Sequence, residues 1–165
     1  MYYRCHYASP IGDLTLASDG EFLTGLWIHG QKFFAQNHAD PVEMPQLPVF
    51  QETVAWLDRY FAGEPVSPAR LPLKPSGTHF QQKVWEILKA IPPGQTVTYG
   101  QIAVLLDNPK ASQAVGSAVG HNPISVIIPC HRVLGAGGKL TGYAGGPAAK
   151  IWLLRHEGIL IPGEI

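Results

Sequence analysis

The sequence predicts two domains: an N-terminal α/β domain, made of a small antiparallel sheet and one helix, and a mostly helical C-terminal domain. Three observations indicate this division. Short apolar segments between turn residues begin the chain, a stretch with four prolines occupies residues 65–77, and apolar residues at helical spacing follow it. We place the domains at residues 1–75 and 76–165, with the proline-rich linker at the end of the first.

The N-terminal elements are three strands and a helix. Strands are expected at residues 2–7, 14–17 and 22–29, because each segment is short, apolar and bounded by turn chemistry such as Asp19-Gly20. A helix is expected from Phe50 and should end at Gly63. Its apolar positions recur at helical spacing: Val54, Leu57, Tyr60 and Phe61. This helix would cover one face of the sheet.

Three helices open the C-terminal domain. Thr78 can cap the first, which Pro92-Pro93-Gly94 ends. The second should run from Tyr99 to just before Asn108-Pro109, and the third covers residues 111–119. The expected inward positions are Phe80, Val84, Trp85, Leu88 and Ile91 on the first helix, and Ile102, Ala103, Leu105 and Leu106 on the second.

The second and third helices have the spacing of a helix-turn-helix, a motif that places its second member in a DNA groove. An ordinary helical hairpin explains the same pattern. The third helix is made of small residues, with Gln113 its one long polar side chain, so its backbone could lie close to another surface. This composition disfavours a helix that reads bases in the major groove.

Composition excludes several classes of protein. With 45% apolar and 15% charged residues the chain is a compact globule, and no apolar run approaches the roughly 20 residues of a membrane helix. No signal peptide is evident, so we expect a cytoplasmic protein. The net charge is zero, but residues 1–75 carry five Lys/Arg against eight Asp/Glu, while residues 76–165 carry seven against four. The second half is therefore the better candidate for contact with an anion.

Cys130 is the candidate nucleophile. Residues 124–128 are expected to form a buried strand that delivers Pro129-Cys130-His131 at its end, and an imidazole can take a thiol proton directly or through water. Adjacent strand residues point to opposite faces, so the backbone must turn at His131 or a water must bridge the two side chains. Glu157, at the end of an amphipathic helix, could hold the Nδ1 proton of His131. The alternatives are a buried, inert cysteine and a solvated terminal glutamate.

The glycine-rich segment at residues 135–146 does not match a phosphate-binding loop, because Leu140 follows Gly138-Lys139. It could form a flexible pocket wall with Tyr143 stacking on a flat ligand, or a plain hairpin with a mobile tip.

These motifs together resemble the O6-alkylguanine-DNA alkyltransferases. The resemblance covers residues 78–165 and is specific, because several segments match in order; the first domain matches loosely, at Ser9-Pro10-Ile11-Gly12 and the strands after it. The matching segments are Tyr99-Gly100-Gln101-Ile102-Ala103, Asn108-Pro109-Lys110-Ala111, Gly120-His121-Asn122-Pro123, Pro129-Cys130-His131-Arg132-Val133, Thr141-Gly142-Tyr143-Ala144-Gly145-Gly146 and Leu153-Leu154-Arg155-His156-Glu157-Gly158.

The resemblance implies a ribonuclease-H-like N-terminal domain and a C-terminal domain with a (winged) helix-turn-helix that enters the DNA minor groove. It implies a monomeric repair protein that flips an O6-alkylguanine, and possibly an O4-alkylthymine, into a pocket and takes the alkyl group irreversibly. A thioether is a very poor leaving group, so each molecule would act once. No cofactor is implied.

Residue roles follow from the same resemblance. Cys130 is the nucleophile, His131 acts as base through a water, Glu157 orients His131, and Asn122 braces the turn. The implied substrate-binding residues are Tyr99, which donates to guanine N3, the Val133 backbone, the Ala144 amide, Tyr143 and Lys150. The implied DNA-binding residues are Ala111, Ser112, Gln113, Ala114, Gly116 and Arg132.

One residue departs from the family pattern. Gln113 stands where an arginine normally fills the space left by the flipped base, which leaves open a protein that recognises alkylated DNA without efficient repair. Intact Cys130 argues against the non-repairing alkyltransferase-like relatives. A Cys-His hydrolase acting on peptides or amides is a further alternative, which would turn over many times. Cys5, His6 and His29 could suggest a zinc site, but Cys5 does not fall at a ligand position of the family, and we predict no metal.

Overall fold

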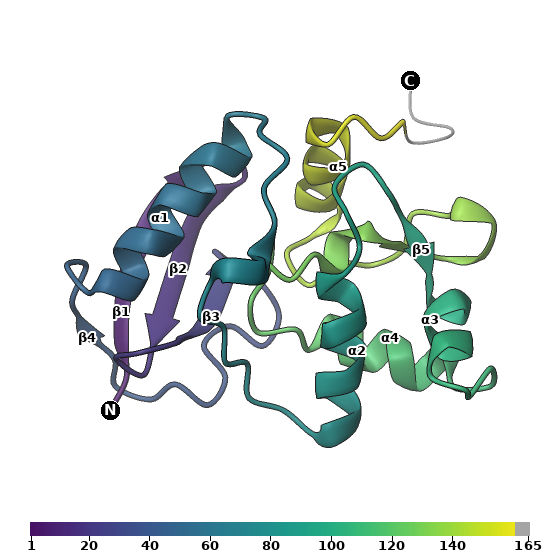
Figure 1. The fold of residues 1–165 in the computed structure, drawn as a ribbon, viewed down its shortest axis with the longest axis horizontal. Coiled ribbons are helices and arrows are strands. Elements are labelled where there is room, and N and C mark those ends of the chain that lie inside the picture. Colours follow the sequence, from purple (N-terminus) through teal and green to yellow (C-terminus); the bar gives the residue numbers. More distant parts are fainter. Residues whose placement is uncertain (161–165) are drawn as a thin grey trace.

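The computed structural model describes residues 1–160 (Figure 1); residues 161–165, the end of the predicted C-terminal domain, lie outside the described part. The N-terminal part is a four-stranded sheet in the order β3-β2-β1-β4. Its strands are β1 (Tyr3–Ser9), β2 (Gly12–Ser18), β3 (Leu23–Ile28) and β4 (Val42–Glu43). β2 pairs antiparallel with β1 and β3, and β4 pairs parallel with β1. The three predicted strands are confirmed.

Helix α1 (Pro48–Phe61) lies across one face of this sheet (Figure 1). Pro48 occupies the first turn of the helix, where a backbone N–H would have no partner within the helix. Gly63 follows the C-terminal end of the helix with a φ of 95°, a conformation that favours glycine. The helix buries Phe50, Leu57 and Tyr60 against the sheet and its neighbours. The predicted covering helix is therefore confirmed.

The C-terminal part is mostly helical. Capping boxes begin both α2 and α3, through Thr78 with Gln81 and Thr98 with Gln101. Its elements are α2 (His79–Lys89), β5 (Val97–Thr98), α3 (Tyr99–Leu105), α4 (Ser112–Gly120), β6 (Val133–Leu134) and α5 (Pro147–His156), with short 3-10 helices at Cys130–Arg132 and Ala136–Gly138. The three predicted helices are confirmed. The inward placement of Leu105 is wrong: its side chain is 65% exposed, on the outer face of α3.

The predicted strand at residues 124–128 is wrong. The segment is a buried turn in which the Ile128 N–H donates to the Ile124 carbonyl (3.0 Å), and Val126 has a φ of 72°. A β-branched residue rarely adopts this left-handed conformation, so the turn depends on contacts that hold it. An apolar run of this length fits a buried strand or a buried turn equally well, and distant contacts decide between them.

The outer edge of β3 joins the two parts of the chain and is closed by segments that pair with it. On this edge Leu26 donates to the Pro123 carbonyl (2.8 Å) and accepts from the Ser125 N–H (2.9 Å). Further along, Leu23 forms the same kind of bridge with Leu73, inside the proline-rich connection. One contiguous apolar core runs from the sheet through α1 and α2 to α4. Within residues 1–160 no helix is long and apolar enough to cross a membrane.

The packing around β3 predicts a specific weak point. A Cβ on Gly25 would lie 2.1 Å from the Trp27 ring, which is 2% exposed and cannot move freely. We expect Gly25→Ala to lower the free energy of unfolding by about 1–3 kcal/mol, measured by urea denaturation. Gly120→Ala is the control, because no heavy atom lies within 4 Å of the added Cβ. Equal stability of the two variants would contradict this packing.

Candidate active site

Cys130 follows the buried turn and is held by it. The Asn122 side chain spans the turn: its Nδ2 donates to the Ile128 carbonyl (2.8 Å), and its Oδ1 accepts from the Ile124 N–H (3.0 Å). Asn122 is 3% exposed, so these bonds form away from solvent. The amide thus provides hydrogen-bond partners for the backbone on both sides of the left-handed Val126, where the chain belongs to no regular element. The residue that the resemblance assigns to bracing the turn thus lies across it.

The Cys130 thiol is protonated at rest. Its side chain is 3% exposed, and burial raises its pKa, while Asn122, Lys150 and Tyr143 act in the opposite direction. A thiolate is the reactive form of cysteine, so a nearby base has to take the proton.

His131 is placed to be that base. The backbone turns after Pro129 into the 3-10 helix Cys130–Arg132, as a working Cys-His pair requires, and His131 is completely buried. Its Nε2 lies 2.7 Å from Glu157 Oε2, and its Nδ1 has no hydrogen-bond partner within residues 1–160. The expected contact through Nδ1 is wrong: the direction of the turn presents Nε2 to the carboxylate.

The protonation states follow from this contact. Burial alone would raise the pKa of Glu157, but hydrogen bonds from His131 and Arg132 and the charge of Arg132 lower it well below its usual range. An ionised carboxylate only accepts, so Nε2 carries the hydrogen. Burial lowers the pKa of His131, which is therefore neutral near pH 7, with its lone pair on the unpartnered Nδ1.

Arg132 neutralises Glu157 inside the protein. Its Nε donates to Glu157 Oε1 (2.7 Å), its Nη2 to Oε2 (3.0 Å) and its Nη1 to the Ile91 carbonyl (2.6 Å). The side chain is 4% exposed. The prediction that Arg132 contacts DNA is therefore wrong, because its donors are engaged inside the protein.

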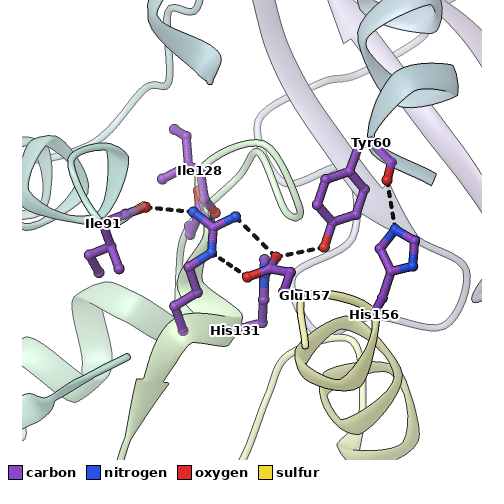
Figure 2. A network of polar contacts seen from close by, with 8 residues as sticks. Tyr60, Ile91, Ile128, His131, His156 and Glu157 are labelled. Atoms are coloured by element: carbon purple, nitrogen blue, oxygen red, sulfur yellow. Dashed lines mark hydrogen bonds and ion pairs between the residues drawn. The ribbon is translucent and has the colours of Figure 1, made fainter. Parts of the chain in front are cut away.

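Tyr60, from α1 of the N-terminal part, completes the carboxylate's partners. Figure 2 shows its hydroxyl pointing at Glu157, and the donor distance to Oε2 is 2.7 Å. From the sequence Tyr60 was expected only as an apolar helix position, and no local pattern marks a contact between residues so far apart. His156, beside Glu157, bonds through Nε2 to the Tyr60 carbonyl (2.6 Å).

Tyr143, which acts on the Cys130 thiol, lines an open cavity of about 810 Å³. Tyr99, Tyr143 and Ala144, all predicted to bind substrate, line it, and the Tyr99 hydroxyl lies 2.8 Å from Thr141 Oγ1. The glycine-rich segment supplies one wall as residues 140–147, and α4 supplies another. Sequence reasoning missed Lys32, Phe33 and His121, which also line it; the Phe33 and His121 rings stack with centroids 4.0 Å apart.

The remaining predicted residues fall into two places. Val133 and Lys150 are buried, and Lys150 Nζ donates to the Val133 carbonyl (2.7 Å), in surroundings where burial lowers the lysine pKa to about 8. On α4, Ser112, Gln113 and Ala114 are exposed, Ala111 at its start is half-buried, and Gly116 lines the cavity. Within residues 1–160 no group of three or more His, Cys, Asp or Glu side chains could hold a metal ion.

Acid should weaken the fold in two stages. The pKa values of His131 and Glu157 are lowered from ordinary values of 6.5 and 4.5, so the unfolded chain binds more protons than the folded chain below these pH values. The free energy of unfolding from urea denaturation should decline below about pH 6.5 and more steeply below about pH 4.5.

The Glu157→Gln variant should be less stable than the unaltered protein at pH 7, because Arg132 loses its counter-charge. Its free energy of unfolding should also change less with pH below 4.5. A flat profile for the unaltered protein between pH 7 and pH 4 would contradict these protonation states.

Two family models match the chain. The model described as 6-O-methylguanine DNA methyltransferase, ribonuclease-like domain, matches residues 1–75. The model described as 6-O-methylguanine DNA methyltransferase, DNA binding domain, matches residues 79–159. The predicted order of an α/β ribonuclease-like domain followed by a mostly helical DNA-binding domain is confirmed.

Two proteins of similar sequence carry the same name. The methylated-DNA–protein-cysteine methyltransferase of Haemophilus influenzae is 45% identical over 159 residues, which span 96% of this chain and 87% of that protein. The protein of the same name from Methanosarcina acetivorans is 47% identical over 96% of this chain and 99% of its own length. The crystal structure of Mycobacterium tuberculosis OGT in complex with DNA is 46% identical, with a TM-score of 0.84 over 94% of this chain and 91% of that one. Matched at this level along nearly all of its length, the chain belongs to the 6-O-methylguanine DNA methyltransferase family.

Proposed function

We propose that this protein repairs DNA by transferring the methyl or alkyl group of an O6-alkylguanine to its own Cys130, once per molecule. The observation that carries the proposal is the series Cys130, His131 and Glu157, linked through Tyr143 to an open cavity walled by a glycine-rich loop and α4. Such a series supplies a nucleophile, a base and the group that orients the base. The names of the similar proteins support the same reaction.

The Cys130 thiol proton passes through a water to His131 Nδ1, and the sulfur attacks the alkyl carbon in line with the O6 bond. A sulfur–carbon bond forms, the carbon–O6 bond breaks, and its electron pair stays on guanine. Tyr99 donates to guanine N3, and the Ala144 amide bonds O6, so charge on the leaving group is stabilised as it appears. The Cys130 and Val133 carbonyls accept from the exocyclic amine, Tyr143 lines the pocket, and Lys150 supports it from within the protein by donating to the Val133 carbonyl.

We propose that α4 enters the minor groove and that Gln113 occupies the space of the flipped base. The small exposed residues Ser112 and Ala114, with Ala111 and Gly116 beside them, support a close approach of this helix to DNA.

The proposal includes a domain boundary at residues 75 and 76, a monomeric state and a cytoplasmic location. The proline-rich composition of residues 65–77 supports this domain boundary.

Cys130→Ala should abolish methyl transfer while leaving DNA binding intact. The test incubates each protein with an oligonucleotide that carries one O6-methylguanine and weighs the intact protein. The unaltered protein should gain one methyl group, about 14 Da, and the variant none. Cys5→Ala is the matched control, because Cys5 is the other buried cysteine and lies in β1, and it should still be methylated. Binding without any gain in the unaltered protein would favour a lesion-recognition protein, and repeated turnover would favour a hydrolase.

Gln113→Arg should tighten DNA binding. The new guanidinium would sit on the exposed face of α4, and the plot of log affinity against log salt should steepen by up to about one unit. Gln51→Arg, an exposed position on α1, adds the same charge elsewhere and should change the affinity less. Equal effects of the two variants in a fluorescence-anisotropy titration would mean that position 113 does not meet the duplex.

A further inference from the structure

Tyr60 reaches the catalytic series from the other half of the chain. It lies in the last turns of α1, its side chain is 2% exposed, and its hydroxyl donates to Glu157 Oε2 at 2.7 Å across 97 positions of sequence (Figure 2). The ring is fixed on two sides, stacked on Trp56 with the planes 5° apart and in edge contact with Phe61. A hydroxyl held this way is a donor of fixed direction.

The oxygen that Tyr60 contacts is the one that holds the base. Glu157 Oε2 accepts from Tyr60 and lies 2.7 Å from His131 Nε2, while Arg132 binds both carboxylate oxygens. Tyr60 and His131 therefore share one acceptor atom. Each donor to that atom restricts the rotation of the Glu157 carboxylate. Each donor also reduces the negative charge that the oxygen offers to the other donors.

We propose that Tyr60 is a positioning residue for alkyl transfer, which fixes Glu157 Oε2 for His131 and moderates the basicity of His131 Nδ1. The inference rests on the proposed function. It makes α1 of the ribonuclease-like domain a working part of the transfer site, although Tyr60 touches neither the thiol nor the cavity. Tyr60 stays protonated throughout, because burial and the charge of Glu157 raise its pKa far above the working range.

The charge balance around His131 gives the direction of the effect. The groups that act on it are Glu157, which favours the imidazolium, and Arg132 and Lys150, which oppose it, all within a buried site. Removing the Tyr60 hydroxyl leaves more negative charge on Glu157 Oε2. The pKa of His131 should then rise, and neutral His131, the form that can accept the thiol proton, should predominate only above a higher pH.

The test is Tyr60→Phe, measured as the second-order rate constant of methyl transfer from an O6-methylguanine oligonucleotide between pH 5 and pH 8.5. We expect a plateau about three- to tenfold lower, because Glu157 is less well fixed, and an acid limb whose midpoint moves to higher pH. Tyr7→Phe is the matched control. It removes a hydroxyl that donates at 2.6 Å to a different carboxylate, Asp58 of α1, and it should change neither quantity.

A second variant keeps the test decisive if Tyr60→Phe folds poorly. Replacing Tyr60 by 3-fluorotyrosine keeps the hydroxyl and the ring and strengthens the donor, so the acid limb should move to lower pH. A purely structural role would not produce shifts of opposite sign in the two variants. An unshifted acid limb in the 3-fluorotyrosine protein, with normal transfer by the unaltered protein, would overturn the role of Tyr60 alone, whether or not Tyr60→Phe folds. No methyl transfer by the unaltered protein would overturn the proposed function and this inference with it.

Discussion

The buried carboxylate of Glu157 is the group on which the order of the site depends. An ionised side chain in a protein interior is costly unless a counter-charge and hydrogen bonds surround it. Glu157 also caps the C-terminal end of α5, where the helix dipole disfavours a negative charge. Arg132, His131 and Tyr60 meet these demands together. His131 and Arg132 come from the turn after Pro129 and Tyr60 comes from α1, so satisfying one carboxylate brings these two segments and the end of α5 into a single arrangement.

The ribonuclease-like domain supports the site from behind. The Gln31 side chain accepts from the Ile28 N–H and from the Ser125 hydroxyl, which ties the turn before Cys130 to the end of β3. The Lys32 N–H donates to the Ala144 carbonyl (3.1 Å), in the loop that walls the cavity. Beside it Gly145 approaches Ile28 so closely that a Cβ would lie 2.4 Å from the Ile28 side chain. Sheet and site are therefore fitted to each other, and neither is a separate module attached by the proline-rich connection.

Sequence reasoning succeeded where the signal is local. Capping residues such as Thr78 and turn glycines such as Gly63 locate helix ends, because their preferences act within a few residues. It failed at residues 124–128, where an apolar run is compatible with more than one buried conformation and the contact with Leu26 decides.

The site divides in the same way. The cysteine-histidine motif and the glycine-rich segment could be recognised along the chain, since each carries its chemistry in adjacent residues. The burial of Arg132 and the contact of Tyr60 with Glu157 could not be recognised from the sequence. A basic residue near a cysteine suggests contact with an anion, and an aromatic residue at helical spacing suggests a core position. The nitrogen through which His131 meets Glu157 depends on the direction of a turn that only the folded backbone defines.

The closed edge of β3 has a consequence for how the molecule behaves in a crowded cell. An edge strand whose N–H and C=O groups face solvent is a template on which other chains can add as strands and begin to aggregate. Here the residues around Leu73 and Ile124 already occupy that edge, and the opposite edge is β4, which has two residues. Separating the two halves would expose the part of this edge at Leu26, which residues 123–125 cover. The protein therefore gains protection from self-association only while both halves are in place, and we expect it to unfold as one cooperative unit.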